Sequence, residues 1–338
     1  METRITRRAF LGGMFAFVAH GLFAQNLIAQ QQKALSLPCR QRRPNPYMEN
    51  GKPIVMVVRG TEFRPMLAKG MSLLGGFSRL GVKSGIHVKP NFVAASPYPV
   101  TTDGLSLLAT IELLQKEGLH DITIAEHAGS GAQATAFQFY GLDKKAKVGG
   151  FKIKDLYNDD DVVSIKDSRW IAMPRVSAFK CVYETPLIIN MPTLKQHAEM
   201  HFTCALKNTV GQIDYQTRMD LHREGTAFDD ERYDRKILMS HYAIAEIASA
   251  INPDLTIIDA RYCLGKSHHI AWGGISLKAD RLIISGDPLA ADRVAAEVLA
   301  ECYSGFIIDM AKPHLDHAAR LGLGAAALKD IVIKDVTV

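Results

Sequence analysis

The sequence predicts an α/β fold with a mainly parallel sheet and helices on both faces, arranged in one lobe or in two. Short apolar runs rich in isoleucine and valine alternate with segments whose apolar residues recur at helical spacing. Strand-then-helix order is typical of parallel sheets, because a helix carries the chain back to the same end of the sheet. Polar residues also follow several of the apolar runs directly, where the sites of such sheets lie.

The predicted strands are the β-branched runs. The first is 54–58, and the second, 85–91, is interrupted near its end by a proline, which cannot donate to a sheet ladder. Five more runs have strand length: 122–125, 187–191, 255–259, 281–285 and 331–333. Shorter strand-like pieces lie at 151–153 and 162–165.

The predicted helices lie between these runs. Thr102-Asp103 can cap a helix over 105–117, whose leucines and isoleucine recur at i, i+3 and i+4. A helical pattern over 62–80 is weakened by three glycines. Further helices are predicted at 132–140, 232–250 and 288–301.

Residues 1–30 resemble a twin-arginine export signal. Arg7-Arg8 precede an apolar stretch, 12–24, that is too short to cross a bilayer comfortably. An ordinary secretory signal or an uncleaved anchor is the alternative. The sequence therefore predicts a periplasmic or secreted protein that is exported by the twin-arginine machinery, with no stable membrane span in the mature chain.

The signal is followed by a predicted arm, residues 31–52, which is rich in Gln, Arg and Pro. This composition is typical of a tether or of a segment that lies on the surface. Its arginines, Arg40, Arg42 and Arg43, could instead dock the chain on a membrane or a partner. The α/β domain is predicted to occupy the remainder, residues 53–338.

Composition and motifs exclude several classes of protein. The 338 residues carry a formal net charge of only +5, without a run of five or more like charges, which argues against a nucleic-acid partner. The 5 cysteines form no C-x-x-C motif, so neither a ferredoxin-type iron–sulfur module nor a zinc ribbon is indicated. Serine hydrolase, zincin and kinase signatures do not occur.

Polar side chains cluster at the ends of four predicted strands. They are Lys89 and Asn91, Glu126 and His127, Asn190 with Lys195 and His197, and Asp259. Because the carboxyl ends of parallel strands meet at one edge of a sheet, these groups are predicted to converge on a single crevice. The alternative is that loops are simply polar.

The segment 195–211 has the densest set of reactive groups. If 197–208 were one helix, His197, His201, Cys204 and Asn208 would share a face, and the first three could hold zinc or another transition metal. The alternative is a helix whose histidines cap it or fill a pocket rim. Lys195 suits anion binding.

Lys207 could be desolvated until its amine is nucleophilic, so that it binds a cofactor covalently or acts as a base. It could equally anchor an anion or carry a surface charge. His222 and the pair His268-His269 lie in segments that read as polar loops, although the pair could also line a pocket mouth. Gly129-Ser130-Gly131 could cradle a phosphate but lacks the known phosphate-loop patterns.

Several blocks resemble the signatures of the domain of unknown function 362 family, and the combination K-x-H followed by A-L-K-N-x-x-G is the most specific. The blocks are Lys89-Pro90-Asn91, Thr101-Thr102, 190–197, 205–211, 258–260 and 286–292. The resemblance covers about residues 54–325. Some members of that family carry ferredoxin-like cysteine motifs, which this chain lacks.

A remoter similarity links the chain to lactate racemase-like enzymes, which use a nickel–pincer nucleotide. Those enzymes resemble this chain in having a His ten residues before a cofactor-bearing Lys and another His some sixteen after it. Here His197 precedes Lys207 by ten residues and His222 follows by fifteen, while His127 matches a further strand-end histidine. The glycine-serine pattern between them is missing. The resemblance implies a pyridinium-type cofactor on Lys207 and histidines acting as acid and base at a hydroxy-acid carbon.

These patterns predict an enzyme that acts on a small anionic substrate, in which lysines fix the anion and His197 with His127 or His222 exchanges protons. The predicted cofactor is a transition metal or a nickel–pincer-like group. The rival is a non-catalytic periplasmic protein that binds a metal or ligand. Beside the catalytic set His197, Lys207, His127 and His222, the predicted binding groups are Lys89, Asn91, Lys195, Asn208 and Asp259.

Overall fold

The computed structural model describes residues 36–128, 133–198, 200–224 and 233–338. The predicted signal, 1–30, and the motif Gly129-Ser130-Gly131 lie outside these residues. Contacts divide the chain into Met1–Leu37 and Pro38–Val338, so the α/β region forms one compact unit and not two lobes. The fold below is that of the second unit.

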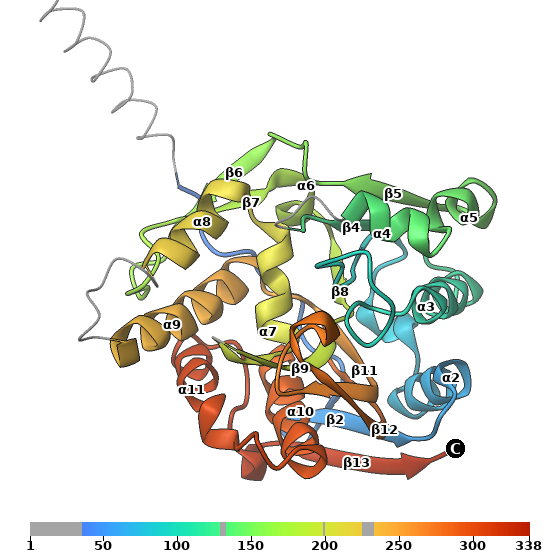
Figure 1. Ribbon diagram of the computed structural model, residues 1–338. Coiled ribbons are helices and arrows are strands. Elements are labelled where there is room, and N and C mark those ends of the chain that lie inside the picture. The colour runs from blue at the N-terminus through green and yellow to red at the C-terminus, as the bar shows by residue number, and fades with distance from the viewer. Residues whose placement is uncertain (1–35, 129–132, 199, 225–232) are drawn as a thin grey trace, which may run out of the picture. The chain divides into compact units, whose positions relative to one another are not determined.

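One large sheet runs through this unit, as Figure 1 shows. Its main order is β13, β2, β12, β11, β8, β3, β4, β5, and six of its pairings are parallel. The antiparallel pairs described in this sheet are β12 with β2 and β11, the hairpin strand β1 (Met48–Glu49) with β2, and β10 (His201–Thr203) with β9 (Thr193–His197). The main strands are β2 (Lys52–Arg59), β3 (Ser84–Lys89), β4 (His120–Glu126), β5 (Phe151–Asp155), β8 (Leu187–Asn190), β11 (Leu255–Gly265), β12 (Ile275–Ser285) and β13 (Val332–Thr337). The mainly parallel sheet is confirmed.

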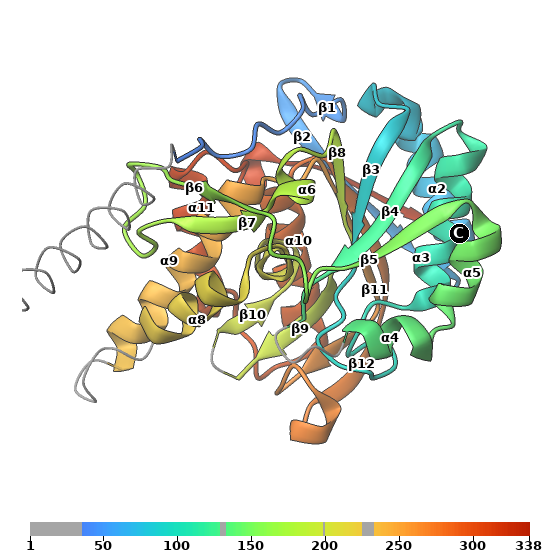
Figure 2. The same ribbon diagram turned by 90° about the horizontal axis from the view of Figure 1, so that it is seen from above.

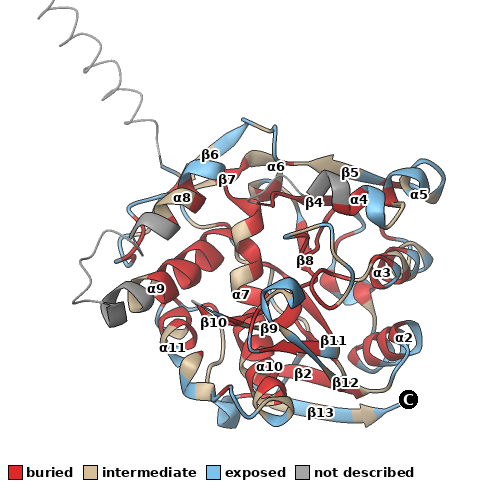
Figure 3. Cartoon of the chain, viewed as in Figure 1, coloured by how far each residue is buried: buried red, intermediate tan, exposed pale blue. Residues whose placement is uncertain are grey.

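Alternating side chains of the strands enter two separate cores. In β2, Val55 and Val57 belong to one core, whereas Ile54, Met56 and Val58 belong to the other. Helices cover both faces, as predicted, and Figure 2 shows them on opposite sides of the sheet. Because both of their faces are buried, central strands such as β2 and β8 are almost continuously apolar and appear buried in Figure 3, whereas β5 and β13 are partly exposed.

The helices of the two faces come from different parts of the chain. On one side lie α2 (Phe63–Leu74), α3 (Gly104–Lys116), α4 (Gln133–Phe139) and α5 (Leu142–Gly149). On the other lie α6 (Lys180–Tyr183), α8 (Tyr215–Glu224), α9 (Tyr233–Ile251), α10 (Pro288–Cys302) and α11 (Lys312–Arg320). A separate two-stranded sheet joins β6 (Val162–Ile165) to β7 (Val176–Phe179).

The predicted helix 62–80 is shorter in the structure. It ends at Leu74, and a 3-10 turn, η1 (Phe77–Leu80), follows. Gly75 and Gly76 separate the two with φ of 90° and 85°, a left-handed backbone that glycine adopts without steric cost. Strands 255–259 and 281–285 are longer than predicted, because β11 and β12 continue as an antiparallel ribbon to Gly265 and Ile275.

Residues 38–52 of the predicted arm belong to the α/β unit and contact its other segments. Arg40 is buried, and one of its guanidinium nitrogens is 2.7 Å from Asp254 Oδ2. The backbone N–H of Arg43 donates to the other oxygen of Asp254 at 2.8 Å, and Arg42 donates to the carbonyl of Leu323 at 2.9 Å. These arginines therefore fasten the arm to the fold and do not form a free docking patch. Among the helices described, none is long and apolar enough to cross a membrane.

Candidate functional site

A pocket opens at the carboxyl ends of β3 and β4, where the predicted crevice was placed. Its cavity measures about 450 Å³. Seven predicted residues line it: Lys89, Asn91, His127, Lys195, His197, Lys207 and Asn208. Glu126, Arg218, His268, His269 and Trp272 also contribute to its wall. The predicted convergence of strand ends is therefore observed for most of the groups.

Asp259 lies outside the pocket lining, contrary to its predicted ligand-binding role. Its buried carboxylate accepts hydrogen bonds from Arg261 at 2.8 and 2.9 Å, from the Ser106 hydroxyl at 2.8 Å and from the Tyr98 hydroxyl at 3.0 Å. These bonds hold the loop around Tyr98 and helix α3 against β11. The side chain of His222 lies outside the part of the structure that is described.

The segment 197–208 is not one helix. His197 ends β9 (Thr193–His197), His201 begins β10 (His201–Thr203), and the two strands form an antiparallel hairpin. Only α7 (Ala205–Asn208) is helical, followed by the 3-10 turn η2 (Thr209–Gln212). The extended backbone places Phe202 in the core while Thr203 reaches the pocket, which a single amphipathic helix would not allow.

The predicted metal set is not assembled. The ring of His197 stacks on His268, with centroids 3.8 Å apart, whereas the ring of His201 lies beside His241. The thiol of Cys204 is fully buried, and this burial raises its pKa well above its usual range. Within the described ranges, no group of three or more His, Cys, Asp or Glu side chains could hold a metal ion.

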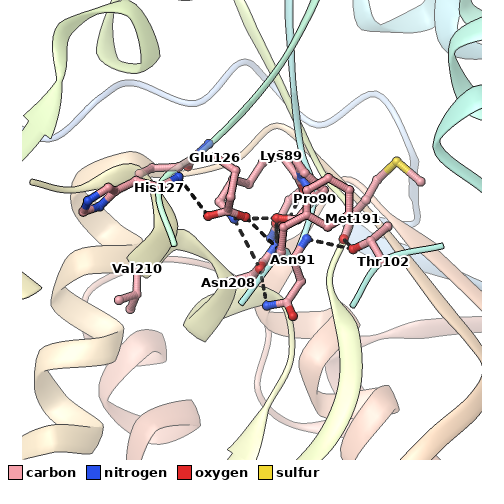
Figure 4. Close-up of polar contacts among 12 residues, drawn as sticks. Lys89, Pro90, Asn91, Thr102, Glu126, His127, Met191, Asn208 and Val210 are labelled. Atoms are coloured by element: carbon pink, nitrogen blue, oxygen red, sulfur yellow. Dashed lines mark hydrogen bonds and ion pairs between the residues drawn. The ribbon is translucent and has the colours of Figure 1, made fainter. Parts of the chain in front are cut away.

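A buried ion pair forms the base of the pocket (Figure 4). Lys89 Nζ lies 2.5 Å from Glu126 Oε2, and both side chains are almost fully buried. The backbone N–H of Phe92 donates to the same oxygen, and that of His127 donates to Oε1 at 3.0 Å. Burial lowers the pKa of Lys89, and the carboxylate of Glu126 opposes that shift. The pair therefore ties the ends of β3 and β4 together.

Three asparagines connect α7 to the strand ends. Asn91 donates to Asn208 Oδ1 at 2.9 Å, Asn208 donates to Asn190 Oδ1 at 2.7 Å, and Asn190 donates to the carbonyl of Ala205 at 2.8 Å. In each bond a side-chain amide nitrogen is the donor. The hydrogen bonds therefore run in one direction, from Asn91 through Asn208 and Asn190 to the backbone carbonyl. Lys207, on the same short helix, is thereby held at the pocket wall.

Positive side chains outnumber negative ones in this pocket. Among the described residues, Lys89, Lys195, Lys207 and Arg218 line it, against the carboxylate of Glu126. The guanidinium of Arg218 is largely buried and donates to the carbonyls of His127 and Val210. Both acceptors are neutral, and the carboxylate of Glu126 opposes the lowering of the Arg218 pKa by burial. This arrangement favours a bound anion.

The imidazoles present one acceptor and one donor. His127 Nδ1 lies 3.0 Å from the carbonyl of Ile213, a bond that requires a proton on Nδ1 and leaves the lone pair on Nε2. Burial, with Arg218 nearby, lowers the pKa of His127 to about 4. His197 Nδ1 accepts from the N–H of Met200 at 3.2 Å, so neutral His197 carries its proton on Nε2. One ring can take up a proton and the other can give one.

Two wall residues, Arg218 and His268, were not among the predicted site groups. Glu126, the last residue of β4, was one of the strand-end groups predicted to converge on the crevice. His268 was expected in a solvated loop, but the β11–β12 ribbon carries it over the pocket to His197, and burial with Lys207 and Lys195 nearby lowers its pKa to about 3. Arg218 had no signal, because it reaches the pocket from α8.

Gly211 lies so close to the buried ion pair of Lys89 and Glu126 that it has no room for a side chain. An added Cβ would lie 2.0 Å from Glu126 Oε1 and 2.7 Å from Lys89 Nζ. Gly211→Ala is therefore expected to lower the free energy of unfolding by about 1–3 kcal/mol, measured by urea denaturation. At Gly118 an added Cβ meets nothing within 4 Å. Gly118→Ala, strained only by its left-handed backbone, should lose less; an equal loss in both variants would contradict the steric argument.

The fold and the pocket define an α/β protein with a cationic, histidine-lined cavity at the carboxyl edge of its sheet. Residues 86–297 match the model of the family described as "Domain of unknown function (DUF362)". This match covers more than half of the chain, and the chain belongs to that family. No curated protein matches the sequence significantly.

Among solved structures, the chain gives a partial match to the lactate racemase apoprotein from Thermoanaerobacterium thermosaccharolyticum. The two share 11% sequence identity over 64% of this chain, with a TM-score of 0.44. The matched region spans about half of the racemase chain, 52%.

Proposed function

We propose that this chain is an enzyme that binds a small anionic substrate in the pocket and moves protons with His127 and His197. The observation that carries the proposal is the presence, in one cavity of about 450 Å³, of an excess of cations together with two imidazoles of opposite tautomer. The cations Lys207 and Arg218 would hold the anion, beside the amine of Lys195. His127 Nε2 would accept a proton, and His197 Nε2 would donate one.

The rival function, a non-catalytic binding protein, would use the same cations. It gives no reason for a proton acceptor and a proton donor to line the same small cavity. The proposal retains export: we expect the twin-arginine signal to deliver the folded protein to the periplasm or beyond, with no nucleic-acid partner. A pincer-type cofactor on Lys207 also remains part of the proposal, supported by the position of Lys207 at the pocket wall.

The test measures binding and proton transfer separately. Binding of lactate, pyruvate and inorganic phosphate is measured by calorimetry, and exchange of carbon-bound hydrogen is followed by NMR in D₂O. Lys207→Gln is expected to weaken anion binding at least about tenfold, because it removes about 1.4 kcal/mol or more of attraction. Lys145→Gln, an exposed lysine of α5, is the matched control and should bind normally.

His127→Gln and His197→Gln should bind the anion and lose the exchange. Binding by the native protein without any exchange would favour the rival function. Absence of binding for every anion would contradict both.

A further inference from the structure

Within the described part of the chain, the ammonium or amine group of Lys195 donates hydrogen bonds to neutral oxygens. Its Nζ donates to Asn91 Oδ1 and to the carbonyl of Val100, both at 2.8 Å. Lys89, by contrast, lies 2.5 Å from a carboxylate oxygen of Glu126. The Lys195 side chain is 1% exposed, yet it contributes to the pocket wall.

This geometry suits a neutral amine. A neutral amine has two N–H groups and one lone pair, and the two carbonyl-type acceptors satisfy both N–H groups. The remaining tetrahedral position carries either a third proton or the lone pair. No carboxylate bonds Lys195 among the described residues, so burial disfavours that third proton.

The surrounding charges act in the same direction overall. Burial, the ammonium of Lys207 and, to a smaller extent, that of Lys89 lower the pKa of Lys195. With the opposing effects of Cys204 and Glu126 included, this pKa is about 7. Burial, with Lys207 and Lys195 nearby, also lowers the pKa of His268, so its ring is neutral and adds no charge beside Lys195. At pH 7 to 8 a substantial fraction of this amine is therefore unprotonated, unlike an exposed lysine.

We propose, building on the function above, that Lys195 forms an imine with a small oxo acid. The amine nitrogen attacks the carbonyl carbon, and the carbonyl oxygen takes up a proton to give a carbinolamine. Loss of that hydroxyl as water, with the remaining proton of the amine nitrogen transferred to it and the N–H of His197 Nε2 as a hydrogen-bond donor to the departing oxygen, leaves a carbon–nitrogen double bond. The overall change is amine plus carbonyl to imine plus water, which needs no oxidant or reductant.

The other groups of the pocket match this substrate class. Lys207 and Arg218 provide the positive charge that a carboxylate next to the carbonyl requires. A protonated imine withdraws electrons from the neighbouring carbon, so the proton on that carbon becomes removable, and His127 Nε2 is an acceptor in the same cavity. The inference thus names the anion of the proposed function as a 2-oxo acid.

The test traps the imine by reduction. The full-length protein is incubated with pyruvate and sodium cyanoborohydride and then mapped by peptide mass spectrometry. The expected result is one carboxyethyl group on the peptide that contains Lys195, with labelling that increases as the pH is raised through about 7. Exposed lysines such as Lys145 supply the background for chemical labelling in the same sample.

Lys195→Arg should remove the label and Lys207→Arg should leave it on Lys195, though more slowly. If Lys195→Arg does not fold, the peptide map of the native protein still decides. A label confined to Lys207, or no label above that of Lys145, would overturn the imine. Calorimetry with pyruvate and with lactate, which has no carbonyl carbon to attack, separates the two proposals: binding without a label on Lys195 leaves the anion site standing, and no binding contradicts both.

Discussion

Glu126→Gln is expected to lower the free energy of unfolding by about 3–5 kcal/mol, the cost of leaving one member of a buried ion pair without its partner. Lys89 Nζ would keep the carbonyl of Pro90 and the amide of Asn208 but lose the carboxylate at 2.5 Å. Guanidinium or urea denaturation at pH 7 measures the change. The matched control is Asp121→Asn, which breaks an exposed pair with Lys152 and should leave the midpoint unchanged.

The pH dependence of the Glu126→Gln variant identifies the cause. Burial lowers the pKa of Lys89, so the folded variant must either bury an ammonium or release its proton. Both cost free energy as long as the unfolded chain keeps that lysine charged, which is below about pH 10. The deficit should therefore be full at neutral pH and shrink as the pH approaches 10.

A double variant, Lys89→Met with Glu126→Leu, removes both charges. It should recover most of the stability, because no buried charge is left unpaired. A loss below about 1 kcal/mol in Glu126→Gln at pH 7 would show that Lys89 is already neutral in the native protein.

Asp292→Ala is expected to lower the free energy of unfolding by about 2–6 kcal/mol, because two buried N–H groups lose their acceptor. Asp292, on α10, accepts from the N–H of Ala205 at 2.6 Å and from that of Leu206 at 2.9 Å. These bonds set the start of α7, the helix that carries Lys207 and Asn208. The variant should therefore also weaken anion binding, although Asp292 does not line the pocket.

Asp292→Asn is the conservative comparison, since it retains one acceptor oxygen and should lose less stability. Burial raises the pKa of Asp292 to about 7, above the value near 4 expected in the unfolded chain. The stability that comes from this proton uptake is fully present below about pH 4 and is lost as the pH rises through about 7. The stability of Asp292→Asn relative to the native protein should therefore improve between pH 4 and 7. A constant difference would show that the carboxylate is ionised throughout.

Most strands could be predicted because their burial on both faces leaves few polar residues in them. The runs 54–58, 187–191 and 281–285 each lie within a strand of the sheet or end at one residue beyond it. Helix 105–117 was also placed within one residue, since its cap and spacing are local properties. The antiparallel insertion of β12 between β2 and β11 was not predictable, because strand order depends on packing between distant segments.

The site was predictable where the sheet itself determines it. Lys89 ends β3 and His127 follows β4, so their convergence is a consequence of parallel topology. The prediction of one helix over 197–208 was wrong. His197 and His201 are at positions i and i+4, a spacing that fits one turn of a helix and also the two sides of a tight hairpin. Arg218 and His268 arrive from other parts of the fold, and nothing local in the sequence marks them.

Strand β2 can form its long-range pairs in the sheet only after later segments of the chain have been synthesised. β2 emerges from the ribosome early, but its two long-range neighbours are supplied by residues 281–284 of β12 and 332–337 of β13. Throughout translation of the intervening chain, its backbone amides and carbonyls have no neighbours within the main sheet other than the short hairpin with β1. The nascent polypeptide therefore exposes an apolar strand until β12 and β13 have also been synthesised, and β2 gains its long-range neighbours only then.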